Sequence, residues 1–139
     1  MNTASRRYHA TQIETASPGE LVVMLYNGAL RALGRAQRAA EEDGAQRFGQ
    51  VASNIAVARQ ILAELSTSLD FNQGILPRRL FALYAYMARR LSDAIGTNGG
   101  PVIEEVSNLL RELREAWADA CAQECGPPRA VSQAVDVSC

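Results

Sequence analysis

The chain has 139 residues, which is the length of a single domain and enough to bury a sizeable hydrophobic core. Its 14 basic and 15 acidic residues leave a formal net charge of −1, which argues against binding to nucleic acid or to an anionic membrane through a basic excess. No segment approaches the roughly 18 apolar residues of a membrane span, and residues 1–18 lack the apolar stretch of a signal peptide. We therefore expect a cytoplasmic protein without membrane insertion.

The first helix signal stands at Ser17, so residues 1–16 are predicted to form an N-terminal arm. Ser17 can cap the helix, Pro18 suits the first helical position, and Glu20 completes the capping-box pattern three residues after the cap. The helix is predicted over residues 17–42. Its core stripe, with spacings of three and four, comprises Val22, Leu25, Ala29, Leu33 and Ala36.

Three further helices follow, separated by stretches rich in glycine and polar residues. They are predicted over residues 46–69, 77–95 and 101–124. Trp117 falls in the apolar register of the last of them, and we expect it in the core. Residues 125–139 contain two prolines and no strong period, which predicts a mobile tail. Strand signals are absent, so the fold class is all-α: an antiparallel four-helix bundle with an N-terminal arm and a mobile C-terminal tail.

The sequence offers little for catalysis or metal binding. The only histidine is His9, in the arm, where a catalytic base would not be preorganised. Cys121 and Cys125 share a helix face and Cys139 ends the chain, but a zinc site needs further thiols or imidazoles. We expect no metal, no cofactor and no enzymatic activity, with Cys121 as a small apolar side chain in the core.

The first helix carries more apolar residues than a bundle seam requires. On one interpretation the chain's own arm covers the excess, with Tyr8 and Ile13 as anchors. On the other, a partner helix binds there. The two interpretations combine if the arm covers this surface until the partner displaces it. A homodimer would use the same surface. The residues in question lie on the shoulders and back of the helix: Leu21, Val23, Met24, Tyr26 and Leu30.

Four ordered blocks of the sequence resemble the FliS family of flagellin export chaperones. The first combines Tyr8 and Gln12 with "TASPGELVVMLYNGALRAL", and it is the most specific. The others are "LSTSLDF", "LFALYAYMARRLSDA" and "EVSNLLRELREAWADA". Together they cover about residues 8–124. The family commonly has aspartate where this chain has Asn27 and Ala85.

The resemblance implies a chaperone that binds the disordered C-terminal segment of flagellin, prevents its polymerisation in the cytoplasm and presents it to the flagellar type III export gate. We expect a monomer or weak homodimer. The alternative is a helical bundle with self-association or a core ligand site and no flagellar role. The predicted partner-binding residues come from the arm, the first helix and the third: Tyr8, Gln12, Ile13, Leu21, Val23, Met24, Tyr26, Asn27, Leu30, Tyr84, Met87 and Leu91.

Overall fold

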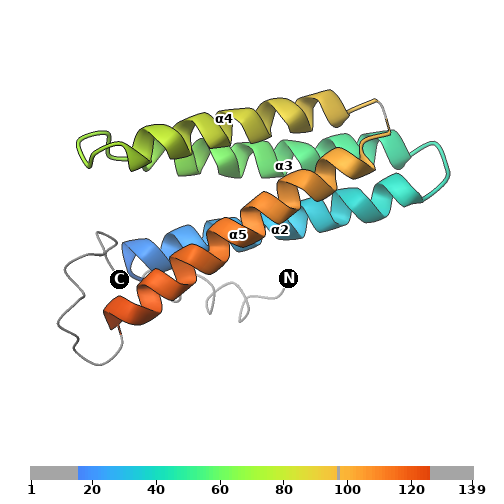
Figure 1. Ribbon diagram of the computed structural model, residues 1–139. Helices are drawn as coiled ribbons and strands as arrows, with labels where there is room; N and C mark the ends of the chain where they lie inside the picture. Colours follow the sequence, from blue (N-terminus) through green and yellow to red (C-terminus); the bar gives the residue numbers. More distant parts are fainter. Residues whose placement is uncertain (1–15, 97, 126–139) are drawn as a thin grey trace.

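Four helices packed side by side form the described part of the chain, residues 16–96 and 98–125 of a computed structural model (Figure 1). They alternate in direction, as an antiparallel bundle requires. Each helix begins and ends within two residues of its predicted range, and the four-helix fold is confirmed. Residues 1–15 and 126–139, which hold nearly all of the predicted arm and tail, lie outside the described residues. The helices are α2 (Pro18–Glu41), α3 (Arg47–Thr67), α4 (Leu76–Ala94) and α5 (Gly100–Cys125).

Helix α2 begins where its capping signal predicts. The Ser17 side-chain oxygen accepts a hydrogen bond from the backbone N–H of Glu20 at 3.2 Å, and Pro18 occupies the first turn. The first N–H groups of a helix have no partner inside the helix, so a capping oxygen satisfies one of them. The cap therefore determines the residue at which α2 begins.

Replacing Ser17 with alanine should lower the free energy of unfolding by about 0.5–2 kcal/mol, because the Glu20 N–H loses its acceptor. Urea denaturation followed by circular dichroism measures the change. Ser17→Asp restores an acceptor and should retain the stability of the unaltered chain. Equal midpoints for the alanine variant and the unaltered chain would show that the cap contributes nothing.

The core lies along the inner faces of all four helices. Helix α2 packs most extensively, against α3 on one side and α5 on the other, while α4 closes the bundle with smaller contacts. Because two neighbours flank it, α2 buries a wide arc of residues. Of the predicted stripe, Ala29, Leu33 and Ala36 are fully buried, whereas Val22 and Leu25 are partly buried and pack against the core. The buried set of α2 is Gly19, Tyr26, Ala29, Ala32, Leu33, Ala36 and Ala39.

A polar cluster joins α4 to α5 on the outer surface. The Arg90 guanidinium donates two hydrogen bonds to one Glu105 oxygen, at 2.9 and 3.1 Å, and the Tyr86 hydroxyl donates to the other at 2.5 Å. The hydrogen bond from Tyr86 lowers the pKa of Glu105 most, and the hydrogen bonds from Arg90 lower it further. The groups are exposed to solvent, so the ion pair contributes little to stability.

No helix within the described residues has the length and apolar character needed to cross a membrane.

Candidate functional site

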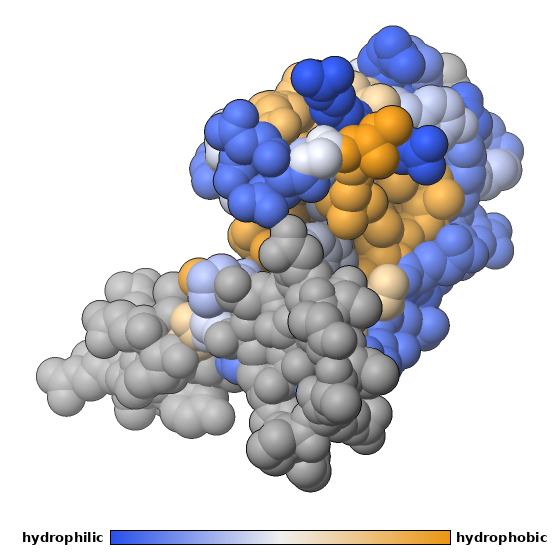
Figure 2. Space-filling model, turned by 60° about the vertical axis from the view of Figure 1, so that its left-hand side comes forward, coloured by the Kyte–Doolittle hydropathy of each residue, from blue (hydrophilic) through white to orange (hydrophobic). Residues whose placement is uncertain are grey.

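An apolar groove lies at the end of the bundle where α2 begins and α3 ends, with a cavity volume of about 530 Å³. The start of α4 and the last turns of α5 complete its walls. Figure 2 shows apolar side chains gathered in a hollow at this end, between polar outer faces. The apolar lining residues are Leu21, Val22, Leu25, Leu65, Leu69, Leu76, Leu80, Tyr84 and Trp117.

Apolar surface continues from the groove onto the connection between α3 and α4. Leu76, at the groove wall, is 55% exposed, and Ile75 beside it is 63% exposed. Phe71 and Phe81 are also about half exposed, and their rings meet edge to face with centroids 5.8 Å apart. A contiguous exposed apolar surface of this kind marks an interaction site.

The rim of the groove is polar and its charged members are acidic. Glu64 and Asp70 line it, together with Thr67, Ser68 and Gln73. Asp70 organises the loop, since its carboxylate accepts from the Asn72 backbone N–H at 3.0 Å and from the Gln73 side-chain amide at 3.3 Å. No arginine lines the groove within the described residues. The groove therefore favours an apolar segment with an uncharged or basic edge.

Two tyrosines meet beneath the groove. The hydroxyls of Tyr26 and Tyr84 are hydrogen-bonded at 2.5 Å, and the ring centroids are 6.5 Å apart. Burial raises the pKa of Tyr26 well above its ordinary value of 10.0, and the neighbouring Tyr84 adds to the effect. Burial also raises the pKa of Tyr84. Both phenols are therefore held in the protonated form.

Raising the pH above about 10 should destabilise the chain through Tyr26. The unfolded state then releases the phenolic proton while the folded state keeps it, so stability that is fully present below the unfolded pKa of 10.0 is lost as the pH rises. Tyr26→Phe removes this contribution, so its free energy of unfolding should depend less steeply on pH. Urea denaturation between pH 8 and roughly pH 11 measures both slopes. Identical slopes would contradict the burial of the Tyr26 hydroxyl.

Among the predicted partner-binding residues that the structure describes, two line this groove, Leu21 and Tyr84. Leu21 is partly exposed in the wall, whereas Tyr84 is 2% exposed in the floor. Tyr8, Gln12 and Ile13 lie outside the described residues. Their predicted roles, and the predicted shielding by the arm, stay predictions.

Three of the predicted partner-binding residues are fully buried in the core: Tyr26, Met87 and Leu91. Tyr26 was expected on the shoulders or back of its helix, but its side chain is fully buried in the core, where its hydroxyl meets that of Tyr84 from α4. Met87 and Leu91 are also fully buried, on the inner face of α4. These side chains hold the bundle together, and none of them lies on its surface.

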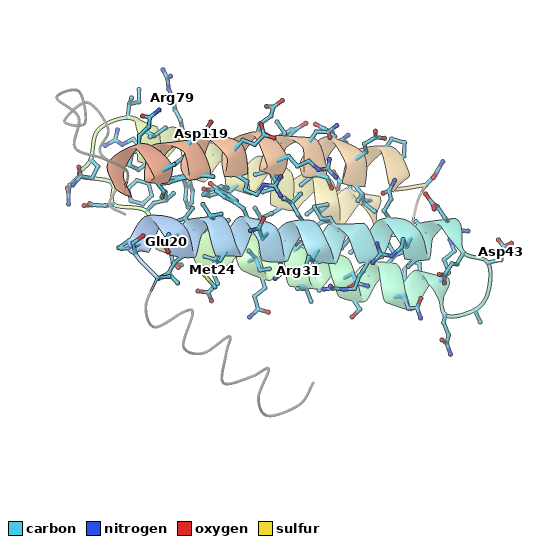
Figure 3. The ribbon with its side chains drawn as sticks, turned by 90° about the horizontal axis from the view of Figure 1, so that it is seen from below. Glu20, Met24, Arg31, Asp43, Arg79 and Asp119 are labelled. Carbon is cyan, nitrogen blue, oxygen red and sulfur yellow. The ribbon has the colours of Figure 1, made fainter. Side chains whose placement is uncertain are left out.

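The remaining predicted residues of α2 lie away from the groove. Met24 extends from the side of α2 turned away from α5, as does Arg31 (Figure 3). Asn27 accepts a hydrogen bond from the Arg114 guanidinium of α5 at 3.2 Å. Val23 and Leu30 are partly buried, like Met24 and Asn27, and none of the four lines the groove.

Most residues of the groove wall were assigned to the core in the sequence analysis or not assigned at all. The helical periodicity assigns three of them to the core: Val22, Leu25 and Trp117. At the end of the bundle where α2 begins, these residues line the groove instead. Trp117 is accordingly only partly buried, although it packs against the core. One signal was available: Phe71, Ile75 and Leu76 place three large apolar side chains in and beside a predicted break.

Comparison with known proteins places the chain in a family. Residues 1–124 match the model of the family described as "Flagellar protein FliS". A flagellar secretion chaperone FliS from Bacillus subtilis (strain 168) is 36% identical over 117 residues, covering 84% of this chain and 85% of that protein. The chain belongs to the FliS family. The FliS of Salmonella typhimurium (strain LT2) is 37% identical over 125 residues, covering 84% of this chain and 90% of that protein.

As a member of the FliS family, the chain is a flagellar secretion chaperone and not an enzyme. The FliS of Escherichia coli (strain K12), 36% identical over 110 residues, matches 78% of this chain and 79% of its own length. In the part of the chain that the structure describes, no three His, Cys, Asp or Glu side chains are grouped so as to hold a metal ion. The Cys121 side chain is buried. The features of the FliS-family chain that suit a partner are its apolar groove and the exposed apolar residues beside it.

Proposed function

We propose that the groove binds the C-terminal segment of flagellin and keeps it from polymerising in the cytoplasm before export. The observation that supports this most directly is the continuous apolar surface from the groove to Phe71, Ile75 and Phe81. A secretion chaperone must cover apolar surface of an unassembled client, and a groove between helices suits an amphipathic segment. The family membership supplies the flagellar context.

Binding of this kind is a coupled folding reaction. The client segment orders as it enters the groove, and that ordering costs about 2–5 kcal/mol of the interaction energy, so the complex can release its client. The half-exposed Leu76 and the partly exposed Leu21 and Leu25 supply apolar area that the client buries. The chaperone then presents the bound client to the flagellar export gate.

Size-exclusion chromatography with light scattering tests the proposal. The chain is mixed with the C-terminal segment of flagellin from the same organism, and a complex with one copy of each is expected. An N-terminal flagellin segment of equal length serves as the control and should elute separately. The free chain is expected to be a monomer or weak homodimer. A stable dimer that binds neither segment would instead favour self-association through the same apolar surface.

The interaction with the export gate needs its own measurement. The preformed complex and the free chain are each passed over the immobilised cytoplasmic domain of the gate protein. We expect the complex to be retained more strongly than the free chain. Equal retention would contradict presentation of a loaded chaperone.

A further inference from the structure

We infer that a surface of four arginines on the outer side of α2 binds an acidic stretch of the flagellin segment whose apolar part occupies the groove. The inference rests on the proposed function and deepens it, because it names the chemistry of a second part of the client. The four residues surround a hollow of about 380 Å³. This arginine surface consists of Arg31, Arg35 and Arg38 of α2 and Arg114 of α5.

The arginine surface is not neutralised by carboxylates within the described part of the chain. Arg35 donates a hydrogen bond to the Asn54 side-chain oxygen at 3.0 Å. Arg114 donates to the Asn27 side-chain oxygen at 3.2 Å. Both acceptors are uncharged, and no described Asp or Glu forms an ion pair with any of the four arginines. Positive charge therefore gathers here, although the whole chain has a formal net charge of −1.

The three arginines of α2 follow one another along a single face of the helix. Arg31, Arg35 and Arg38 are spaced by four and three residues, which makes consecutive members neighbours on the helix surface, and all three are exposed. Arg31 points outward from the bundle in Figure 3. Like charges at this spacing repel one another, whereas a carboxylate bound between them interacts favourably with more than one guanidinium. The row extends over roughly 10 Å of helix, which suits several acidic residues better than a single charge.

The arginine surface begins close to the groove on both helices. Asn27, which lines the hollow, follows the groove residue Leu25 by two positions on α2. Arg114 precedes the groove residue Trp117 by three positions on α5. One helical turn advances by about 5.4 Å, so a client that leaves the groove reaches the arginines within a few residues.

The charges on the two sides of the groove give the client a direction. The acidic rim residues Glu64 and Asp70 belong to the end of α3 and the loop after it, whereas the arginines belong to α2 and α5. A client with an acidic stretch on one side of its apolar part therefore meets complementary charge in one orientation and like charge in the other. Such an arrangement selects the orientation of the bound segment.

Calorimetry with the flagellin C-terminal segment tests the inference on a double variant, Arg31→Gln with Arg38→Gln. Both side chains are exposed, so the fold should be retained. At about 50 mM salt the double variant should bind the segment about three- to tenfold more weakly, because two exposed ion pairs are lost. At about 500 mM salt the difference should shrink, because salt screens exposed charges.

The matched control is the double variant Arg59→Gln with Arg89→Gln. It removes the same charge from exposed positions on α3 and α4, outside both the groove and the hollow. Its affinity should stay within about twofold of that of the unaltered chain. Replacing the acidic residues of the client with their amides completes a double-mutant cycle. This change should weaken binding to the unaltered chain and cost little further in the Arg31 and Arg38 variant.

The possible outcomes separate this inference from the proposed function. Absence of binding by the unaltered chain would overturn the proposed function itself. Full binding by the Arg31 and Arg38 variant at low salt, or an equal loss in the control, would overturn the inference alone. Light scattering of the free chain covers the remaining occupant. A dimer that only the Arg31 and Arg38 variant dissociates would show a second copy on the arginine surface and would also contradict the inference.

Discussion

Replacing Leu91 with alanine should lower the free energy of unfolding by about 2–5 kcal/mol. The Leu91 side chain is fully buried among the core residues of the bundle, so the substitution removes buried methyl groups and leaves a cavity. Urea denaturation followed by circular dichroism measures the loss. A loss of this size is a large share of the total stability of a small domain.

Leu91→Met is the matched control, because it keeps the side-chain volume and should cost less than about 1.5 kcal/mol. The pair of variants distinguishes the two placements of this residue. If Leu91 lies in the core, Leu91→Ala lowers the free energy of unfolding strongly, whereas Leu91→Met lowers it only slightly. If Leu91→Ala left the unfolding midpoint unchanged, Leu91 would not be a core residue, and the partner-binding role predicted for it from the sequence would be favoured.

Replacing Leu76 with glutamate should weaken binding of the flagellin C-terminal segment by about 10- to 100-fold. Burial of one leucine side chain contributes about 1.5–3 kcal/mol, and each 1.4 kcal/mol changes an affinity by about tenfold. Leu76 is 55% exposed in the free chain, so the substitution removes little packing there. Leu76 is the first residue of α4, so a glutamate introduced there also interacts favourably with the helix dipole.

Val57→Glu is the matched control for this variant. Val57 is an exposed aliphatic residue on α3, 42% exposed and outside the groove, so the same change of side chain occurs far from the proposed contact. Both variants should keep the unfolding midpoint of the unaltered chain. Calorimetric titration with the flagellin segment compares their affinities. Equal affinities for Leu76→Glu and Val57→Glu would exclude the groove as the client site.

The family and the helix ends could be read from the sequence, because both depend on local signals. The Ser17 cap, Pro18 and the glycine-rich breaks act over a few residues, and the structure follows them closely. The block that begins at Ser17 carries the FliS resemblance, which the comparisons confirm. The position of the groove could not be read in this way, since its walls come from four helices far apart in the chain.

By itself, the sequence determined that α2 carries surplus apolar side chains and that the chain has helical periodicity without a catalytic cluster. Only the tertiary structure decided where the surplus lies. Tyr26 faces inward because α2 packs between α3 and α5, and it then needs the Tyr84 hydroxyl as a buried hydrogen-bond partner. Leu25 has the same periodicity as the core, yet it lines a groove because α4 packs less closely than the other helices. Periodicity determines the face of a helix on which a residue lies, and the arrangement of neighbouring helices determines whether that face is covered.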